Sequence, residues 1–183
     1  MSRVVSLTGT PGTGKTSIAG HLAGIGWHTI ELTELARREG AVVGRDEARQ
    51  TDEVDLDLLL DAVARELGSL QTTGNILLVS HLSHLMTCDQ VIVLRTSPRI
   101  LRQRLEARGW PESKVRENLE AEAVGVILVE AMELEPAVPV LEADTTSEGP
   151  GVTAKRIADA LDGEDVGLEA GLIDWSEEVM EWY

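Results

Sequence analysis

The chain is poor in cysteine and aromatic residues and lacks long apolar runs, and each of these absences argues against a class of protein. Its 183 residues include one cysteine, Cys88, and no phenylalanine, and aromatic residues make up 3%. A single cysteine excludes an internal disulfide and is typical of a reducing compartment, and we expect Cys88 to be a half-buried filler thiol. No apolar run approaches the roughly 18 residues of a membrane span. We therefore expect no signal peptide, no membrane anchor and a cytoplasmic location.

Basic side chains are also scarce. There are 32 acidic residues against 16 basic ones, three of them lysines, and the formal net charge is −16. This charge disfavours non-specific binding of nucleic acid and of membrane surfaces. An acidic, lysine-poor composition is typical of adaptation to high salt, where screening makes self-repulsion tolerable. The competing explanation is an acidic surface that meets a basic partner.

The basic residues that remain are unevenly placed. Five of the thirteen arginines lie between positions 95 and 108. After Arg156 there is no base, and eight acidic residues follow between Asp162 and Glu181. A local group of arginines is what a bound polyphosphate requires, even in an acidic protein.

Glycine is concentrated in one motif near the start of the chain. Residues 9–16 read GTPGTGKT, a full match to GxxxxGK[ST], between the apolar run Val4–Leu7 and a helical segment. The three glycines let the backbone wrap closely around phosphates, and free N–H groups of the turn point at the anion. Lys15 would reach the β- and γ-phosphates, and the Thr16 hydroxyl would hold Mg²⁺. The motif predicts binding of a nucleoside triphosphate.

Strand-like and helix-like segments alternate along the chain, which indicates an α/β fold with a parallel sheet. The expected strands are Val4–Leu7, His28–Ile30, Ile76–Ser80, Gln90–Leu94 and Val138–Leu141. The expected helices are Thr16–Ala23, Leu32–Glu39, Val54–Leu67, Pro98–Ala107, Glu112–Leu134 and Val152–Leu161. Residues after Gly163 are expected to form an acidic tail with some apolar residues that can dock.

Arginines that follow the fourth expected strand are candidate phosphate ligands. Arg104 and Arg108 are four residues apart and share one face of a helix. Phosphoryl transfer needs positive charge around the migrating group, and ligands of a parallel sheet bind at the carboxyl ends of its strands. Arg95 lies at such an end, where a functional and a structural role are both open. Arg102 with Glu106 is expected to be an ordinary surface pair.

Several motifs together resemble the atypical adenylate kinases of archaea and eukaryotes, of the adenylate kinase isoenzyme six type. The segments that carry the resemblance are Gly9–Ser17, Leu35–Arg37, Ser80–Leu85, Val93–Thr96 and Arg104–Gly109. It extends over about residues 1–162 and keeps the order and spacing of the motifs.

The resemblance implies a three-layer P-loop nucleoside-monophosphate-kinase fold. Its parallel five-stranded sheet would have the order 2-3-1-4-5 and would be flanked by helices. Residues 1–162 would form the kinase domain, with a monophosphate-binding lobe at 30–53 and a lid at 107–117. Residues 163–183 would be an acidic C-terminal tail.

The resemblance also implies roles for single residues. Arg37 matches the arginine that reaches the acceptor phosphate, and His81 matches a histidine near the γ-phosphate or the attacking water. We expect Lys15, Arg104, Arg108 and His81 to be catalytic, and Thr16 to hold the metal. The residues expected to bind the nucleotide are Gly9, Gly12, Thr13, Gly14, Lys15, Thr16, Ser17 and Arg108. A zinc site at His81 and His84 is not expected, because no carboxylate or cysteine completes it.

One position departs from the family pattern. The family has Asp-x-His or Glu-x-His at the end of the third strand, where the carboxylate orders the Mg²⁺ shell, but this chain has Val79-Ser80-His81. Valine offers no ligand oxygen. The ion would then depend on Thr16, phosphate oxygens and water, with Ser80 acting through a water. We expect nucleotide binding to survive this change better than catalysis does.

Three functions are compatible with these observations. In the first, Mg²⁺-ATP donates its γ-phosphoryl group to AMP and gives two ADP, with slow ATPase activity beside it. In the second, which the resemblance implies, the chain is an ATP-switched assembly factor for the small ribosomal subunit that chaperones a basic ribosomal protein. The third is a small-metabolite kinase of the same fold.

Overall fold

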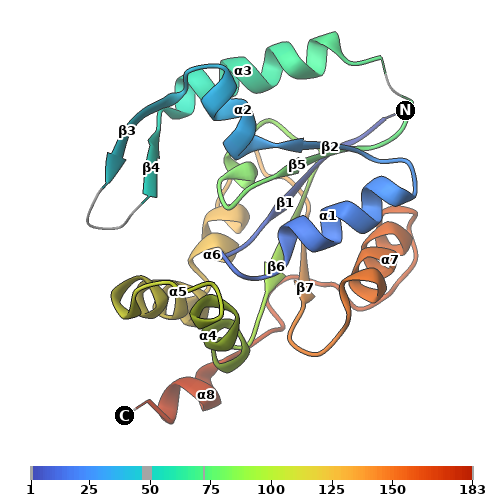
Figure 1. The fold of residues 1–183 in the computed structure, drawn as a ribbon. Coiled ribbons are helices and arrows are strands. Elements are labelled where there is room, and N and C mark those ends of the chain that lie inside the picture. The colour runs from blue at the N-terminus through green and yellow to red at the C-terminus, as the bar shows by residue number, and fades with distance from the viewer. Residues whose placement is uncertain (1, 47–50, 72, 183) are drawn as a thin grey trace.

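The computed structural model describes residues 2–46, 51–71 and 73–182, and its centre is one parallel sheet (Figure 1). The strands are β1 (Val4–Thr8), β2 (His28–Glu31), β5 (Ile76–Val79), β6 (Gln90–Arg95) and β7 (Val140–Asp144). Their order is β2-β5-β1-β6-β7, and every neighbouring pair is parallel. The expected order 2-3-1-4-5 is confirmed.

Helices cover both faces of the sheet, which makes three layers (Figure 1). On one face, α1 (Lys15–Gly24) and α7 (Pro150–Leu161) pack against alternate residues of the strands, among them Leu7, Leu77 and Val79. On the other face, α2 (Leu32–Arg38) and α3 (Leu56–Ser69) cover β2 and β5. The interior strand β5 is apolar on both sides, as buried parallel strands are, whereas β1 has the buried polar residues Ser6 and Thr8 on one side.

Three further helices follow β6 in the chain: α4 (Pro98–Glu106), α5 (Glu112–Val124) and α6 (Val126–Met132). A 3₁₀ turn at Ser83–Leu85 lies between β5 and β6. The continuous helix expected at 112–134 is wrong, because Gly125 has φ +68° and separates α5 from α6. A left-handed residue ends one helix and lets the next begin in a new direction.

An antiparallel hairpin, absent from the sequence-based prediction, lies in the expected monophosphate lobe. It consists of β3 (Val42–Asp46) and β4 (Thr51–Val54), and residues 47–50 of the expected lobe lie outside the described residues. Its residues alternate between half-buried and exposed without a buried face, so the hydrophobic pattern was too weak to predict it. The last strand of the sheet also begins and ends later than expected, at 140–144 instead of 138–141.

The acidic C-terminal residues lie against the rest of the fold. Leu168 is buried in the core cluster under α1 and α7, and its carbonyl accepts a hydrogen bond from the Glu142 backbone N–H at 2.8 Å. The short helix α8 (Ser176–Met180) reaches the start of α4. There Glu178 Oε2 accepts hydrogen bonds from Ser97 Oγ at 2.8 Å and from the Arg99 backbone N–H at 3.2 Å.

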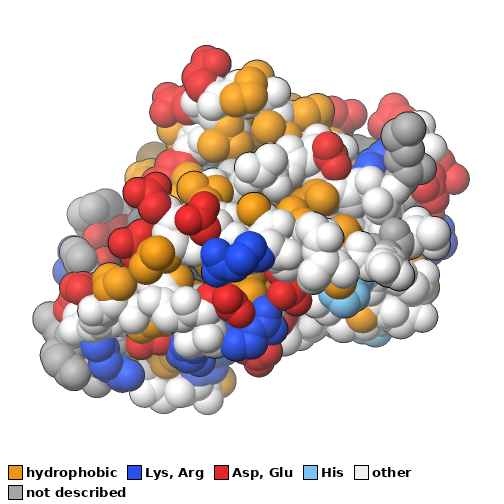
Figure 2. Space-filling model, turned by 90° about the horizontal axis from the view of Figure 1, so that it is seen from above, with side chains coloured by type: hydrophobic (Ala, Val, Ile, Leu, Met, Phe, Trp, Pro, Cys, Tyr) orange, Lys and Arg blue, Asp and Glu red, His pale blue; other side chains and the backbone are white. Residues whose placement is uncertain are grey.

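The surface mixes acidic and basic side chains. On α2 and α3, Arg38 pairs with Glu66 at 2.6 Å and Arg65 with Glu39 at 3.2 Å. The view from above shows blue basic side chains set between red acidic ones and apolar groups (Figure 2). Within the described part of the chain, no helix has the length and apolar character needed to cross a membrane.

Candidate nucleotide-binding site

The loop between β1 and α1 has a backbone that only glycine adopts readily. Gly9, Gly12 and Gly14 have φ values of +135°, +100° and +99°. A Cβ on Gly9 would lie 2.4 Å from the Leu94 carbonyl oxygen, and one on Gly12 would lie 2.7 Å from Leu101 Cδ1. The loop is therefore held tightly between β6 and α4, and its N–H groups precede the N-terminus of α1.

Lys15 is the first residue of α1, and its ammonium group lies inside the loop. Nζ donates to the carbonyl oxygens of Gly9 at 2.6 Å and Thr10 at 3.1 Å. Burial lowers the pKa of Lys15 to about 8; Arg108 acts in the same direction, and Glu122 and Glu31 oppose it. A phosphate placed beside this ammonium would restore its preference for the charged form.

A pocket of about 210 Å³ opens in front of the loop. Its wall brings together most of the residues that the sequence assigned to ATP and metal. Its lining residues are Pro11, Gly12, Gly14, Lys15, Thr16, Ser17, Glu31, Thr33, Val79, Ser80, His81 and Arg108. Gly9 and Thr13 lie behind this wall, and Thr13 Oγ1 donates to the Thr10 carbonyl at 2.9 Å, so both shape the loop from within.

A larger cavity of about 630 Å³ adjoins the first one and shares Pro11, Thr33, Ser80 and His81 with it. Residues of α2, the hairpin and α5 form its wall, and Arg37 is among them. The Arg37 guanidinium pairs with Asp52 Oδ2 at 2.8 Å, and this hydrogen bond holds the pKa of Asp52 below its usual range. The lining is mostly apolar, with Leu32, Ala36 and Val42 as examples, which suits a planar base.

His81 lines both cavities. Burial lowers its pKa to about 4, with Lys15, His84 and Lys114 adding to the effect, so the imidazole is neutral near pH 7. His84 has a different environment, because it is buried and contacts Thr8 Oγ1 at 3.1 Å and Glu130 Oε2 at 3.0 Å. Among the described residues, no cluster of three His, Cys, Asp or Glu side chains could hold a metal by itself.

Arg104 and Arg108, four residues apart, lie in different surroundings. Arg104 Nη2 donates to the Thr145 carbonyl at 2.6 Å, and Nη1 reaches the Gly12 carbonyl at 3.4 Å. Burial and the nearby Arg108 lower the pKa of Arg104. Arg108 is exposed and lies on the pocket wall, whereas Arg104 supports the loop from the α4 side.

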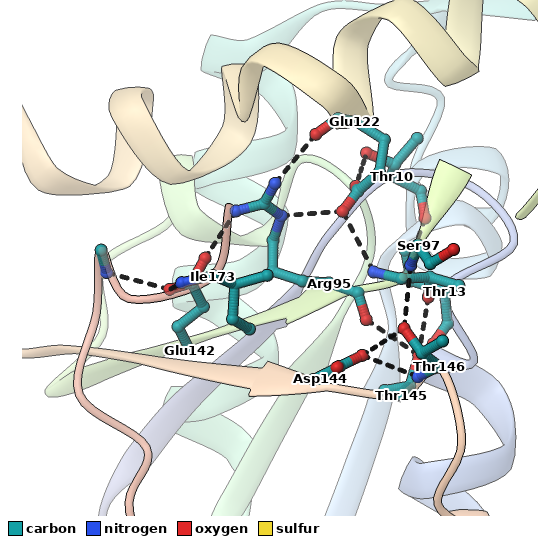
Figure 3. A network of polar contacts seen from close by, with 12 residues as sticks. Thr10, Thr13, Arg95, Ser97, Glu122, Glu142, Asp144, Thr145, Thr146 and Ile173 are labelled. Carbon is teal, nitrogen blue, oxygen red and sulfur yellow. Dashed lines mark hydrogen bonds and ion pairs between the residues drawn. The ribbon is translucent and has the colours of Figure 1, made fainter. Parts of the chain in front are cut away.

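Arg95 is structural, which settles the alternative left open by the sequence. Its Nε donates to Glu122 Oε1 at 2.7 Å, and its Nη1 donates to Glu142 Oε1 at 2.5 Å (Figure 3). The other Glu122 oxygen accepts from Thr10 Oγ1 at 2.6 Å, and the other Glu142 oxygen accepts from the N–H groups of residues 171–173. All three charged side chains are buried. We refer to Arg95, Glu122 and Glu142 as the buried ion cluster.

Glu31 is a pocket residue that sequence reasoning missed. It is the last residue of β2, and within the part of the chain that the structure describes its carboxylate makes no hydrogen bond or ion pair. Burial raises the pKa of Glu31, with Glu34 acting in the same direction and Lys15 against it. Its position at the carboxyl end of an expected strand was the signal that could have identified it.

The chain is similar in sequence and in fold to known proteins. A family model described as an AAA domain matches residues 5–125. A protein of Methanothermobacter thermautotrophicus named "Putative adenylate kinase" is 44% identical over 94% of this chain and 97% of its own length. A protein of Thermococcus onnurineus with the same name is 40% identical over 96% and 92%. The fold also matches a shikimate kinase of Acinetobacter baumannii solved with shikimate, with a TM-score of 0.62, 17% identity and coverage of 91% and 96%.

Proposed function

The chain belongs to the adenylate kinase family represented by these archaeal relatives, and from this premise we propose that it transfers the γ-phosphoryl group of ATP to AMP. The observation that carries the proposal is the pair of adjoining cavities. One is built on a phosphate-binding loop, the other has an arginine and apolar walls, and they share Pro11, Thr33, Ser80 and His81. Two nucleotides bound in them would meet with their phosphates near His81.

On the donor side, the residues divide into those that hold the phosphates and those that follow the moving charge. The loop N–H groups and Lys15 would bind the β- and γ-phosphates. Arg108, exposed at the mouth of the pocket, would stabilise charge as it develops on the migrating group. Arg104 would act from behind by fixing the loop carbonyl of Gly12.

On the acceptor side, Arg37 would bind the phosphate of AMP. In the structure Arg37 pairs with the half-buried Asp52. The Arg37 side chain is 61% exposed, and such surface pairs contribute little stability. An incoming phosphate with two negative charges competes well for the guanidinium fork. The neutral imidazole of His81 could accept or donate one hydrogen bond to the reacting oxygens or to water.

The residues present also fit a magnesium ion. The Thr16 hydroxyl lies on the pocket wall at the start of α1, together with the Ser80 hydroxyl and the Glu31 carboxylate. These are hard oxygen donors of the kind that Mg²⁺ prefers. When bound there, Mg²⁺ would neutralise part of the phosphate charge during transfer.

The proposal is tested by following ADP formation in high salt with Mg²⁺-ATP, with and without AMP. Formation of two ADP per ATP only when AMP is present supports the kinase. Arg37→Ala should raise the KM for AMP by tenfold or more and leave ATP affinity unchanged, because it removes a charged hydrogen bond to the acceptor alone. AMP-independent release of phosphate as the only reaction would contradict the proposal.

The acidic charge supports a second candidate, a nucleotide-switched chaperone for a basic ribosomal protein. With a net charge of −16, the surface would attract a basic tail and repel nucleic acid. This function predicts that basic peptides bind with an affinity that falls with salt and differs between the ATP and ADP states. Equal affinity in both nucleotide states would remove the switch.

A further inference from the structure

Among the described residues that line the pocket in front of the loop, one has a carboxylate, and this residue is Glu31. Glu31 is the last residue of β2. The loop and the start of α1 also lie at the carboxyl ends of the strands (Figure 1). The sequence motifs assigned no role to this residue.

The sheet register places Glu31 directly beside Val79. The two residues are partners across the parallel pair β2–β5. Ile30 packs toward α2 and α3, whereas Val79 packs toward α1 and α7. Because successive side chains of a strand point to opposite faces, Glu31 projects from the same face as Val79. That face is the one on which α1 begins with Lys15 and Thr16.

β2 and β5 differ in the cost of placing an ionised carboxylate at their carboxyl ends. Val79 belongs to an interior strand, is 2% exposed, and has no atom that can bind a cation. β2 is the edge strand of the sheet, and Glu31 at its end is only half-buried. A carboxylate can therefore be kept ionised at position 31 with a smaller desolvation penalty than at position 79.

Magnesium bound to a nucleotide commonly has such a carboxylate nearby. In P-loop proteins the ion is held by the loop hydroxyl, by phosphate oxygens and by a carboxylate at the end of a neighbouring strand. Mg²⁺ commonly uses only one or two protein carboxylates beside substrate phosphates. Thr16 and Glu31 line the same small pocket and provide one hydroxyl and one carboxylate.

We propose that Glu31 supplies the carboxylate of the magnesium site, from the strand next to the one that ends in Val79. The ion is held between Thr16 and Glu31, directly or through water, when ATP is bound. This inference rests on the proposed function, because the ion arrives with the nucleotide.

Calorimetry of ATP binding with excess Mg²⁺ and with EDTA tests the inference without relying on turnover. In the unmodified protein, ATP should bind more tightly with Mg²⁺. In Glu31→Gln, affinity for Mg²⁺-ATP should fall by about tenfold or more, as when metal-site partners are removed elsewhere. Affinity for metal-free ATP should stay the same or rise, because a negative charge beside the phosphates is gone.

Two further variants make the result specific. Glu34→Gln removes an equal charge three residues away, at an exposed position outside the pocket, and should leave the Mg²⁺ dependence unchanged. Adding Val79→Asp to Glu31→Gln returns a carboxylate to the same face one strand away and should restore much of the Mg²⁺ dependence. Val79→Asp alone should change it little, since Glu31 already serves the ion.

The inference is wrong if Glu31→Gln keeps the Mg²⁺ dependence of the unmodified protein, or if Glu34→Gln loses it equally. It is also wrong if Glu31→Gln raises only the KM for AMP, which would assign Glu31 to the acceptor. If the unmodified protein does not bind ATP at all, both this inference and the proposed function are wrong. If AMP-dependent ADP formation is present and only the Mg²⁺ result fails, the kinase assignment stands without this carboxylate.

Discussion

Arg95 and Arg108 show how differently the two sides of the phosphate loop use charge. Behind the loop, Arg95 is 3% exposed and is bonded to Glu122 and Glu142, so its charge is neutralised within the fold. In front of the loop, Arg108 is exposed on the pocket wall, and the ammonium of the half-buried Lys15 has two loop carbonyls as its hydrogen-bond partners among the described residues. The first arrangement fixes the shape of the loop, and the second leaves positive charge for a ligand. Substitutions behind the loop should lower stability, and those in front should lower activity.

The largest effect is expected for Glu122→Ala. It removes the hydrogen bonds that the carboxylate accepts from Arg95, Thr10 and the Thr96 backbone N–H, and it leaves a buried guanidinium short of a partner. The free energy of unfolding should fall by about 3–5 kcal/mol, as for other broken buried pairs. Denaturant titration in high salt measures this difference.

The control for that experiment is Glu120→Ala on the same helix. Glu120 is exposed and pairs with Arg116 at 2.7 Å in an i, i+4 arrangement, so its loss should change stability by no more than about 0.5 kcal/mol. Equal effects of the two substitutions would mean that the buried ion cluster does not stabilise the loop.

Lys15→Met should have the largest effect on activity. Removal of one charge-stabilising donor from an active site typically lowers kcat by about 10²–10³-fold. The free energy of unfolding should not fall, because burial already disfavours the charged ammonium and lowers its pKa to about 8. ADP formation and thermal unfolding of the same preparation test both statements, and a destabilised variant would show that Lys15 belongs with the paired charges.

Arg108→Lys should reduce kcat by about tenfold and leave ATP affinity within a few-fold. The substitution keeps the charge but loses the planar fork that follows the transferring group. Arg99→Lys, at an exposed position on α4, serves as the matched control. Full kcat in Arg108→Lys would make Arg108 an ordinary surface charge.

The smallest effect concerns pH. The pKa of Lys15 is about 8 in the folded protein and 10.5 when unperturbed, so the unfolded chain binds more protons between these values. The contribution of Lys15 to stability should therefore rise with pH across that window. ATP affinity should change in the opposite direction, because bound phosphate favours the protonated ammonium.

Calorimetry in two buffers of different ionisation enthalpy measures this proton linkage. ATP binding should take up few protons at pH 7 and up to about one proton at pH 9. Lys15→Met should abolish the difference between the two pH values. Uptake that persists in the variant would assign the proton to another group.

The local parts of this architecture could be predicted from the sequence. β1, the loop and α1 are contiguous, so one motif with its flanking apolar run defines them, and the order of the parallel strands follows from the family resemblance. The resemblance also identified Lys15, Thr16, Ser17, His81 and Arg108, which share the pocket wall.

The parts that depend on distant residues could not be predicted. Arg95 could be assigned only when Glu122 and Glu142, 27 and 47 residues later, were seen to contact it. The hairpin lacks a buried face, and Gly125 inside an otherwise helical pattern gave no sign that it breaks the helix. Glu31 follows the end of an expected strand, but its position beside Val79 depends on strand register, which the sequence does not state.

The contacts of Glu142 have a consequence for the order in which the fold is completed during synthesis. One Glu142 oxygen binds Arg95, and the other accepts N–H groups from residues 171–173. During translation the phosphate loop is synthesised first. The buried ion cluster behind the loop lacks the N–H donors of residues 171–173 until more than 150 further residues have been added. We therefore expect an emerging chain to acquire its full affinity for ATP only near the end of translation, although the binding motif leaves the ribosome first.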